Sequence, residues 1–128
     1  MIRAGLTGLL LWLFSTAALA GGSVETSPSS SVKTSLRVES PLLGRDLRYS
    51  IYLPERSPYA PPPPVLYLLH GLGGNERDWL RIGSIKQTVD KMISKGEIPP
   101  LAIVMPGAGN SWYVDSATHG PVESALLD

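Results

Sequence analysis

Three glycines, Gly71, Gly73 and Gly74, lie within a stretch of four positions and directly follow an uncharged apolar run at residues 65–69. Glycine lets the backbone turn sharply and leaves the neighbouring N–H groups uncovered by side chains. Uncovered N–H groups of this kind hold anions, and in acyl transfer they stabilise the oxygen that becomes negative. We therefore expect this segment to bind a negative or polarised oxygen. The alternative is a plain turn between a strand and a helix.

A second glycine-rich segment, at residues 106–116, carries polar and aromatic side chains. Trp112 and Tyr113 offer flat apolar surfaces with polar edges, which suit an aromatic or acyl group. The alternative is that both rings simply cover the core. Ser111 matches the first half of a G-x-S-x-G nucleophile motif, but Tyr113 occupies the position where that motif needs glycine. We therefore do not expect Ser111 to be a nucleophile.

The residues that other reaction classes need are absent or isolated. The chain contains no cysteine, which excludes thiolate nucleophiles and disulfides. Its two histidines, His70 and His119, are far apart in the sequence, and Asp78 and Asp115 are single carboxylates in expected loops. This set predicts no metal site and no cofactor. A serine, an acid and a histidine in the order of a hydrolase triad are not found either.

Patterns of apolar and polar residues predict the strands that position the two segments. Residues 34–39 and 47–53 alternate, and they predict two antiparallel strands joined by a turn at residues 41–46. Residues 65–69 and 101–105 carry no charge, which is typical of interior strands in a parallel sheet that are buried on both faces.

One amphipathic helix is expected between the two interior strands, at residues 84–95. Ser84 and Gln87 form a possible capping box at its start, and Gly96 is placed to end it. Shorter helical segments are expected at residues 76–80 and 121–128. A right-handed crossover through the main helix brings both glycine-rich segments to the carboxyl ends of their strands, where open α/β sheets bind ligands.

The segment His70-Gly71-Leu72-Gly73-Gly74, followed by Asp78-Trp79, resembles the esterase D-like family of α/β-hydrolases, which includes feruloyl esterases, S-formylglutathione hydrolases and mycolyltransferases. Residues 106–116 resemble the segment after the fourth strand of the same enzymes. The resemblance covers residues 35–128. It implies an α/β fold: the N-terminal portion of a hydrolase sheet, with an antiparallel strand pair followed by a βαβ unit. The implied activity is that of a serine carboxylic-ester hydrolase, or of an acyltransferase using the same covalent route.

The resemblance also implies roles for single residues. The backbone N–H of Leu72 is expected to be the catalytic donor that stabilises the oxyanion, while His70, Gly71, Gly73 and Gly74 support the loop. The family carries its base histidine near the end of a much longer chain, so His70 is not expected to be a general base. The residues expected to bind the acyl or alcohol part of a substrate are Asn110, Ser111, Trp112 and Tyr113.

In the resembling family the nucleophilic serine follows the helix that begins near Pro121, so the match covers only the first part of an enzyme. We expect the chain of 128 residues to be inactive alone, with the strand at residues 101–105 left with an unpaired apolar edge. The expected partner is a small-molecule ester. Two other classes stay open: a non-catalytic exported module that binds an ester or a sugar, and a subunit that assembles with a second polypeptide.

Residues 1–20 have the pattern of a signal peptide, with a basic Arg3, an apolar stretch at residues 6–14 and a small-residue cleavage site ending at Ala20. Cleavage predicts an exported chain, periplasmic or secreted, without a stable membrane span; the alternative is an uncleaved anchor. Residues 21–33 are expected to be a flexible lead-in and residues 34–128 a single incomplete domain. A formal net charge of zero gives no reason to expect a nucleic-acid partner, and the oligomeric state stays open.

Overall fold

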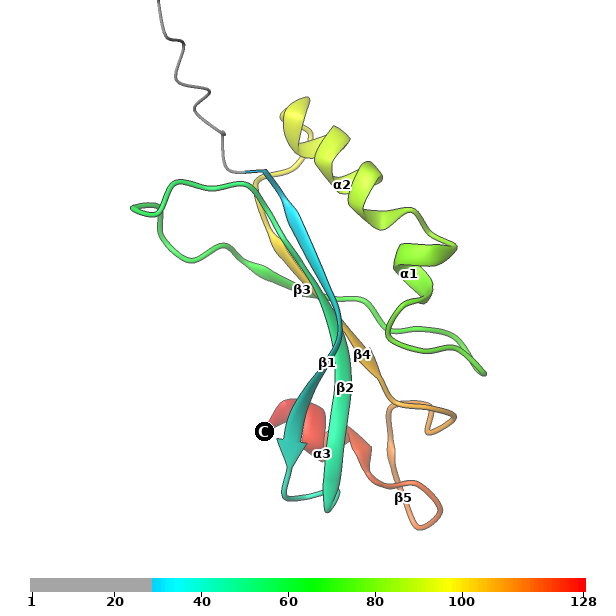
Figure 1. The fold of residues 1–128 in the computed structure, drawn as a ribbon. Helices are drawn as coiled ribbons and strands as arrows, with labels where there is room; N and C mark the ends of the chain where they lie inside the picture. Colours follow the sequence, from blue (N-terminus) through cyan, green and yellow to red (C-terminus); the bar gives the residue numbers. More distant parts are fainter. Residues whose placement is uncertain (1–28) are drawn as a thin grey trace, which may run out of the picture.

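A computed structural model describes residues 29–128, which form one mixed sheet with helices on both faces (Figure 1). The strands of this sheet are β1 (Ser31–Ser40), β2 (Arg45–Leu53), β3 (Val65–Tyr67) and β4 (Ala102–Gly107), in the spatial order β1-β2-β4-β3. The helices are α1 (Asp78–Arg81), α2 (Ile85–Ser94) and α3 (Val122–Leu127), and a small separate hairpin pairs β5 (Asp115–Ser116) with β6 (Gly120–Pro121). The expected signal peptide and most of the expected lead-in lie outside the described residues.

The first two strands pair antiparallel, as predicted, through a turn in which the Gly44 N–H donates to the carbonyl of Pro41. The predicted lead-in extends too far, because residues 31–33 already pair with β2 in the register that matches Ser31 with Leu53. The register shifts between Lys33 and Leu36, where β1 contains a bulge. The bulge interrupts the alternation of side chains, so the sequence pattern reveals only the part of the strand that follows it.

The strand β4 occupies the interior of the sheet, with β2 antiparallel on one side and β3 parallel on the other. Ile103 and Met105 of β4 are fully buried, as the uncharged run predicts. The prediction of burial for residues 65–69 is wrong: Val65 and Tyr67 are 55% and 56% exposed, because within the described residues β3 has a neighbour on one side only. The open apolar edge therefore belongs to β3, and not to the strand at residues 101–105.

The helix α2 covers one face of the sheet, where Val89 joins Tyr52, Ile103 and Met105 in the core. At its end the Gly96 N–H donates to Ile93 and the Glu97 N–H to Met92, which is the Schellman arrangement expected from a glycine stop. Gly96 adopts a φ of +69°, in the left-handed region that favours glycine. These bonds satisfy carbonyls that the end of the helix would otherwise leave free.

The predicted capping box at the start of α2 is wrong. Ser84 has a left-handed backbone with a φ of 46°, and its side chain makes no capping hydrogen bond. The carbonyl of Ser84 instead accepts from both the N–H and the hydroxyl of Thr88, at 3.2 Å each. A capping side chain needs an extended backbone at this position, and the turn that connects α1 to α2 does not provide one.

A hydrogen-bonded side chain joins α2 to the sheet. The hydroxyl of Tyr52 on β2 donates to Asp90 on α2 at 2.8 Å, and Lys86 contacts the same carboxylate at 2.6 Å. Burial, followed by the bond to Asp90, raises the pKa of Tyr52 to about 12. Burial opposes the charge of Asp90, but the bonds from Lys86, Ser30 and Tyr52 outweigh it and lower the pKa of that carboxyl. No helix within residues 29–128 is both long and apolar enough to cross a membrane.

Candidate functional site

The two glycine-rich segments meet at the carboxyl ends of β3 and β4, and three hydrogen bonds join them. The Nε2 atom of His70 accepts from the Ala108 N–H at 3.1 Å, and the hydroxyl of Tyr113 accepts from the His70 N–H at 2.8 Å. The side-chain oxygen of Asn110 accepts from the Gly73 N–H at 2.9 Å. The parallel pairing of the strands brings these residues together, as the crossover argument predicts.

His70 fixes the shape of the first segment. It is 8% exposed, and its Nδ1 lies 2.8 Å from the carbonyl of Gly71. Because Nε2 accepts from an N–H, Nδ1 must carry the proton and donate to that carbonyl. The imidazole ring also lies against the ring of Tyr113, with centroids 5.3 Å apart. Both ring nitrogens are therefore engaged, and neither is free to take a proton from a substrate.

The N–H of Leu72 differs from those of the residues that follow it. The Gly73 N–H donates to Asn110, and the Gly74 N–H donates to the carbonyl of Gly71 at 3.0 Å. Within residues 29–128, the Leu72 N–H donates to no acceptor. Leu72 borders a small hollow of about 80 Å³. The residues that line this hollow are His70, Gly71, Leu72, Gly109, Asn110, Trp112 and Tyr113.

Two of the three loop glycines are required, Gly73 by its backbone conformation and Gly74 by its surroundings. Gly73 has a φ of +76°, which side chains other than hydrogen disfavour. A Cβ on Gly74 would lie 2.3 Å from the carboxylate of Asp78, which itself accepts from the Asn75 N–H at 3.1 Å. Gly71 is different, since a Cβ there would meet nothing within 4 Å. The loop is thus closely packed on one side and open on the side of Leu72.

The second segment places its four predicted substrate-binding residues in different environments. Ser111 is 2% exposed and its hydroxyl accepts from the Tyr113 N–H at 3.2 Å, whereas Trp112 is 71% exposed. Asn110 holds Gly73, as described above, and Tyr113 also donates to the carbonyl of Pro106 at 3.3 Å. Burial raises the pKa of the Tyr113 hydroxyl. Contact of these residues with a substrate stays a prediction.

Trp112 and Tyr113 both adopt left-handed backbone conformations, with φ values of 57° and 58°. Consecutive left-handed residues that are not glycine are strained, and such strain persists only where the surrounding contacts enforce it. Here the two hydrogen bonds of the Tyr113 hydroxyl hold the segment against β3 and β4. Strain of this kind is concentrated at functional sites in proteins.

A family model described as "Putative esterase" matches residues 40–126, which is more than half of the chain. The chain belongs to the putative esterase family. The solved structures similar to this chain include a ferulic acid esterase, with 28% sequence identity and a TM-score of 0.71 over 79% of this chain and 40% of that one. The predicted α/β fold and the predicted family are therefore confirmed.

Two solved structures from Staphylococcus aureus are also similar to this chain. One is the fluorophosphonate-binding serine hydrolase F, at 26% identity and a TM-score of 0.63. The other is the S-formylglutathione hydrolase FrmB, at 26% identity and a TM-score of 0.58. The alignment to each covers 77% of this chain and 38% of the other protein. The chain therefore spans about two fifths of the length of these three solved structures.

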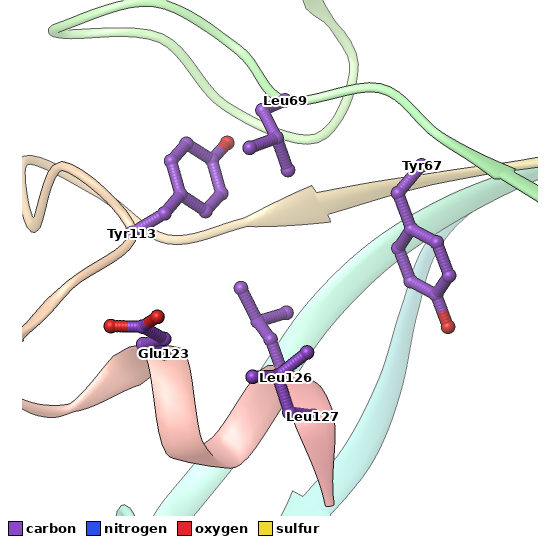
Figure 2. A pocket seen from close by; sticks show the side chains of 6 residues that line it. All are labelled: Tyr67, Leu69, Tyr113, Glu123, Leu126 and Leu127. Atoms are coloured by element: carbon purple, nitrogen blue, oxygen red, sulfur yellow. The ribbon is translucent and has the colours of Figure 1, made fainter.

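A larger apolar pocket lies next to the hollow beside Leu72. It has a volume of about 500 Å³, and Figure 2 shows Tyr113 and Leu69 facing the residues of α3 across it. Its lining consists of Tyr67, Leu69, Tyr113, Glu123, Leu126 and Leu127. Sequence reasoning missed this pocket, because only the tertiary fold brings α3 beside the exposed side chains of β3. Tyr113 borders both the pocket and the hollow.

The helix α3 is held at the pocket by Asp115 of β5. Asp115 accepts from the N–H of Ser124 at 3.0 Å and from its hydroxyl at 2.6 Å, and these bonds lower the pKa of Asp115. His119 lies in the exposed turn between β5 and β6, where its N–H donates to Ser116 at 3.1 Å. Within residues 29–128, no three histidine, aspartate or glutamate side chains are grouped so that they could hold a metal ion.

Proposed function

We propose that this chain provides the oxyanion-stabilising part of an exported serine carboxylic-ester hydrolase. The observation that carries the proposal is the Leu72 N–H, which donates to no acceptor within residues 29–128, whereas the N–H groups of Gly73 and Gly74 that follow it are both engaged. Attack on an ester carbonyl places a negative charge on its oxygen, and a fixed backbone N–H stabilises that charge most when no rearrangement is needed. An acyltransferase of the same family uses the same intermediate and is the alternative at the same site.

The surroundings of Leu72 favour an ester with an aromatic or apolar part. The pocket beside the hollow is lined mainly by apolar and aromatic side chains, including Tyr113 and Leu126. The indole of Trp112 is also exposed at the rim of the hollow and is able to stack on a flat group. The one charged side chain of the pocket lining, Glu123, would disfavour an anionic substituent at its end of the pocket.

We further propose that residues 1–128 alone do not turn over an ester. Ser111 is buried and its hydroxyl is engaged, so it is a poor candidate for the nucleophile. His70 has no free ring nitrogen, and His119 lies in a different loop. Hydrolysis then requires a serine, an acid and a histidine from other residues. Export is proposed on residues 1–20, and N-terminal sequencing of the exported chain would test it: a start at Gly21 supports cleavage.

A second candidate function is that of a subunit that assembles with another polypeptide. The open edge of β3 favours it, since Val65, Leu66 and Tyr67 are each about half exposed on a strand with a free side. Exposed apolar edges bind further strands. Recovery of the full chain in a stable complex with a second polypeptide that carries a G-x-S-x-G segment would favour this candidate. A chain that binds esters by itself without turnover would instead favour a binding module.

The decisive experiment removes one N–H. A chimera would carry residues 31–126 of this chain, from the start of the strand β1, in place of the matching segment of the ferulic acid esterase, which supplies the rest of the enzyme. In that chimera, an ester bond in place of the peptide bond between Gly71 and Leu72 deletes the Leu72 N–H and leaves the side chain in place. We expect kcat on an aromatic ester to fall by on the order of a hundredfold or more, with little change in KM.

The matched control is Leu72→Ala, which keeps the N–H and removes most of the side chain. We expect this variant to retain kcat within a few fold, because the leucine side chain is 66% exposed. The proposal is wrong if deleting the N–H leaves kcat unchanged while the thermal midpoint shows that the chimera is folded. It is equally wrong if the side-chain variant loses as much activity as the backbone variant.

A further inference from the structure

Glu76 is the one carboxylate that is buried within residues 29–128, with 6% of the residue exposed. It lies in the connection between β3 and α1, four positions after Leu72. Burying a carboxylate costs free energy unless hydrogen bonds or charges compensate it. The contacts of Glu76 therefore need an explanation, which neither the oxyanion role of Leu72 nor the loop contacts of His70 provides.

The carboxylate of Glu76 connects the loop to two strands of the sheet. Its Oε1 accepts from the hydroxyl of Ser35 on β1 at 3.0 Å, and the half-exposed Arg77 guanidinium lies 3.8 Å from the same oxygen. Its Oε2 packs on the backbone at the end of β4, since a Cβ added to Gly107 would lie 3.0 Å from it. A side chain at Gly107 would therefore push the carboxylate aside by a few tenths of an ångström.

Ser35 reaches Glu76 because β1 is distorted at that point. Ser35 lies within the bulge between Lys33 and Leu36 and has a left-handed φ of 52°. Its N–H donates to the hydroxyl of the fully buried Ser50 at 3.4 Å, so the N–H and the hydroxyl of the strained residue are both engaged. Bulges redirect side chains in this way, and the strain is maintained by the contacts that it makes possible.

We propose that Glu76 is a positioning residue for the N–H of Leu72. His70 fixes the beginning of the loop to β4 through Ala108, and Glu76 fixes its end to β1 and β4 through Ser35 and Gly107. Between these two attachments the Leu72 N–H keeps its place without a hydrogen bond of its own. This role of Glu76 rests on the proposed function of Leu72. The attachment of the loop by Glu76 is nevertheless measurable without catalysis.

The first test is hydrogen exchange in the full chain of 128 residues, followed by NMR. In Glu76→Ala we expect the amides of Gly73 and Gly74 to exchange on the order of tenfold faster or more, because the end of the loop is released. The amides of Ile103 and Met105 in the centre of the sheet are expected to keep their rates. A residue that contributes only to global stability would instead accelerate exchange at all four amides alike.

Two further variants keep the test decisive if Glu76→Ala does not fold. Ser35→Ala removes only the hydroxyl that Glu76 binds, and we expect it to accelerate exchange at Gly73 and Gly74 in the same direction. Glu76→Gln retains an oxygen for Ser35, so we expect it to restore most of the protection. The matched control is Glu97→Ala, which removes an exposed carboxylate that contacts Lys95 at 3.6 Å. We expect no change at the loop amides in this control.

The chimera separates this inference from the proposed function. We expect Ser35→Ala and Glu76→Ala to lower kcat by about tenfold with little change in KM, and Glu76→Gln to recover most of it. If the Glu76 and Ser35 variants exchange their loop amides faster but deletion of the Leu72 N–H leaves kcat unchanged, Glu76 attaches the loop and the oxyanion role of Leu72 is wrong. Unchanged loop exchange in Glu76→Ala and Ser35→Ala would overturn the positioning role, whatever the activity.

Discussion

Replacing Gly74 with alanine is expected to destabilise the protein, because the glycine has no space for a side chain. The new Cβ would lie 2.3 Å from the Asp78 carboxylate, 3.0 Å from the carbonyl of Gly71 and 3.1 Å from Nδ1 of His70. The carboxylate is able to rotate away, but it then loses the bond from the Asn75 N–H. The carbonyl belongs to the backbone, so the loop itself must shift by a few tenths of an ångström.

The size of the effect follows from these contacts. Overpacking of this kind typically costs about 1–3 kcal/mol, and the loss of a hydrogen bond to a charged group lies in the same range. The protein relieves the clash either by tolerating the strain or by losing the hydrogen bond, so the two costs do not add. We therefore expect the free energy of unfolding to fall by about 1–3 kcal/mol in Gly74→Ala. The control Gly71→Ala adds the same methyl group where nothing lies within 4 Å. It is expected to be neutral or slightly stabilising.

The assay is urea denaturation of the full chain, followed by tryptophan fluorescence. Trp79 lies in α1 and donates through its indole N–H to the carbonyl of Leu69, so its emission reports on the loop and on the sheet together. We expect a lower midpoint for Gly74→Ala with an unchanged slope, and the wild-type midpoint for Gly71→Ala. Equal losses in both variants, or wild-type stability in Gly74→Ala, would refute the packing argument.

Two further predictions concern hydroxyl groups that join distant segments. The pKa of Tyr52 is raised to about 12 in the folded protein from an ordinary value of 10.0. The neutral hydroxyl of Tyr52 therefore contributes its full stabilisation of the fold below pH 10, and this stabilisation is lost as the pH rises to about 12. We expect the free energy of unfolding of Tyr52→Phe to fall less between pH 8 and pH 12 than that of the wild type, as measured by denaturation curves. An equal fall in both proteins would contradict the role given to Tyr52. Tyr113→Phe removes the hydroxyl that bridges His70 and Pro106. We expect the free energy of unfolding to fall by about 1–2 kcal/mol in urea denaturation and the His70 amide to exchange faster. Exchange of that amide at the wild-type rate would show that the bridge does not hold the two segments together.

Several features of this protein could be predicted from the sequence because they depend on neighbouring residues. The alternation in residues 47–53 predicts a strand, and the apolar spacing before Gly96 predicts the helix and its end. The meeting of the two glycine-rich segments was also predictable, since parallel strands joined by a right-handed crossover end on the same side. The position of Leu72 within the loop came from the family resemblance of its surrounding residues.

Other features could not be predicted, because they depend on pairing between distant residues. The exposed edge of β3 depends on which strands find a neighbour, and an uncharged run looks the same in either case. The capping box at Ser84 failed because the turn before α2 sets a left-handed backbone that the sequence motif does not reveal. Ser111 is polar by type, yet the loop turns it inward.

By itself, the sequence determined the family, the order of the elements and the backbone that the glycines allow near Leu72, since these depend on residue type and local spacing. The tertiary structure alone decided that the Leu72 N–H has no partner within residues 29–128, while the N–H groups of Gly73 and Gly74 are engaged. It also decided that a bulge in β1 brings Ser35 to a buried Glu76. The physical reason is that a hydrogen bond depends on distance and direction in space, and residues forty positions apart acquire both only when the sheet has formed.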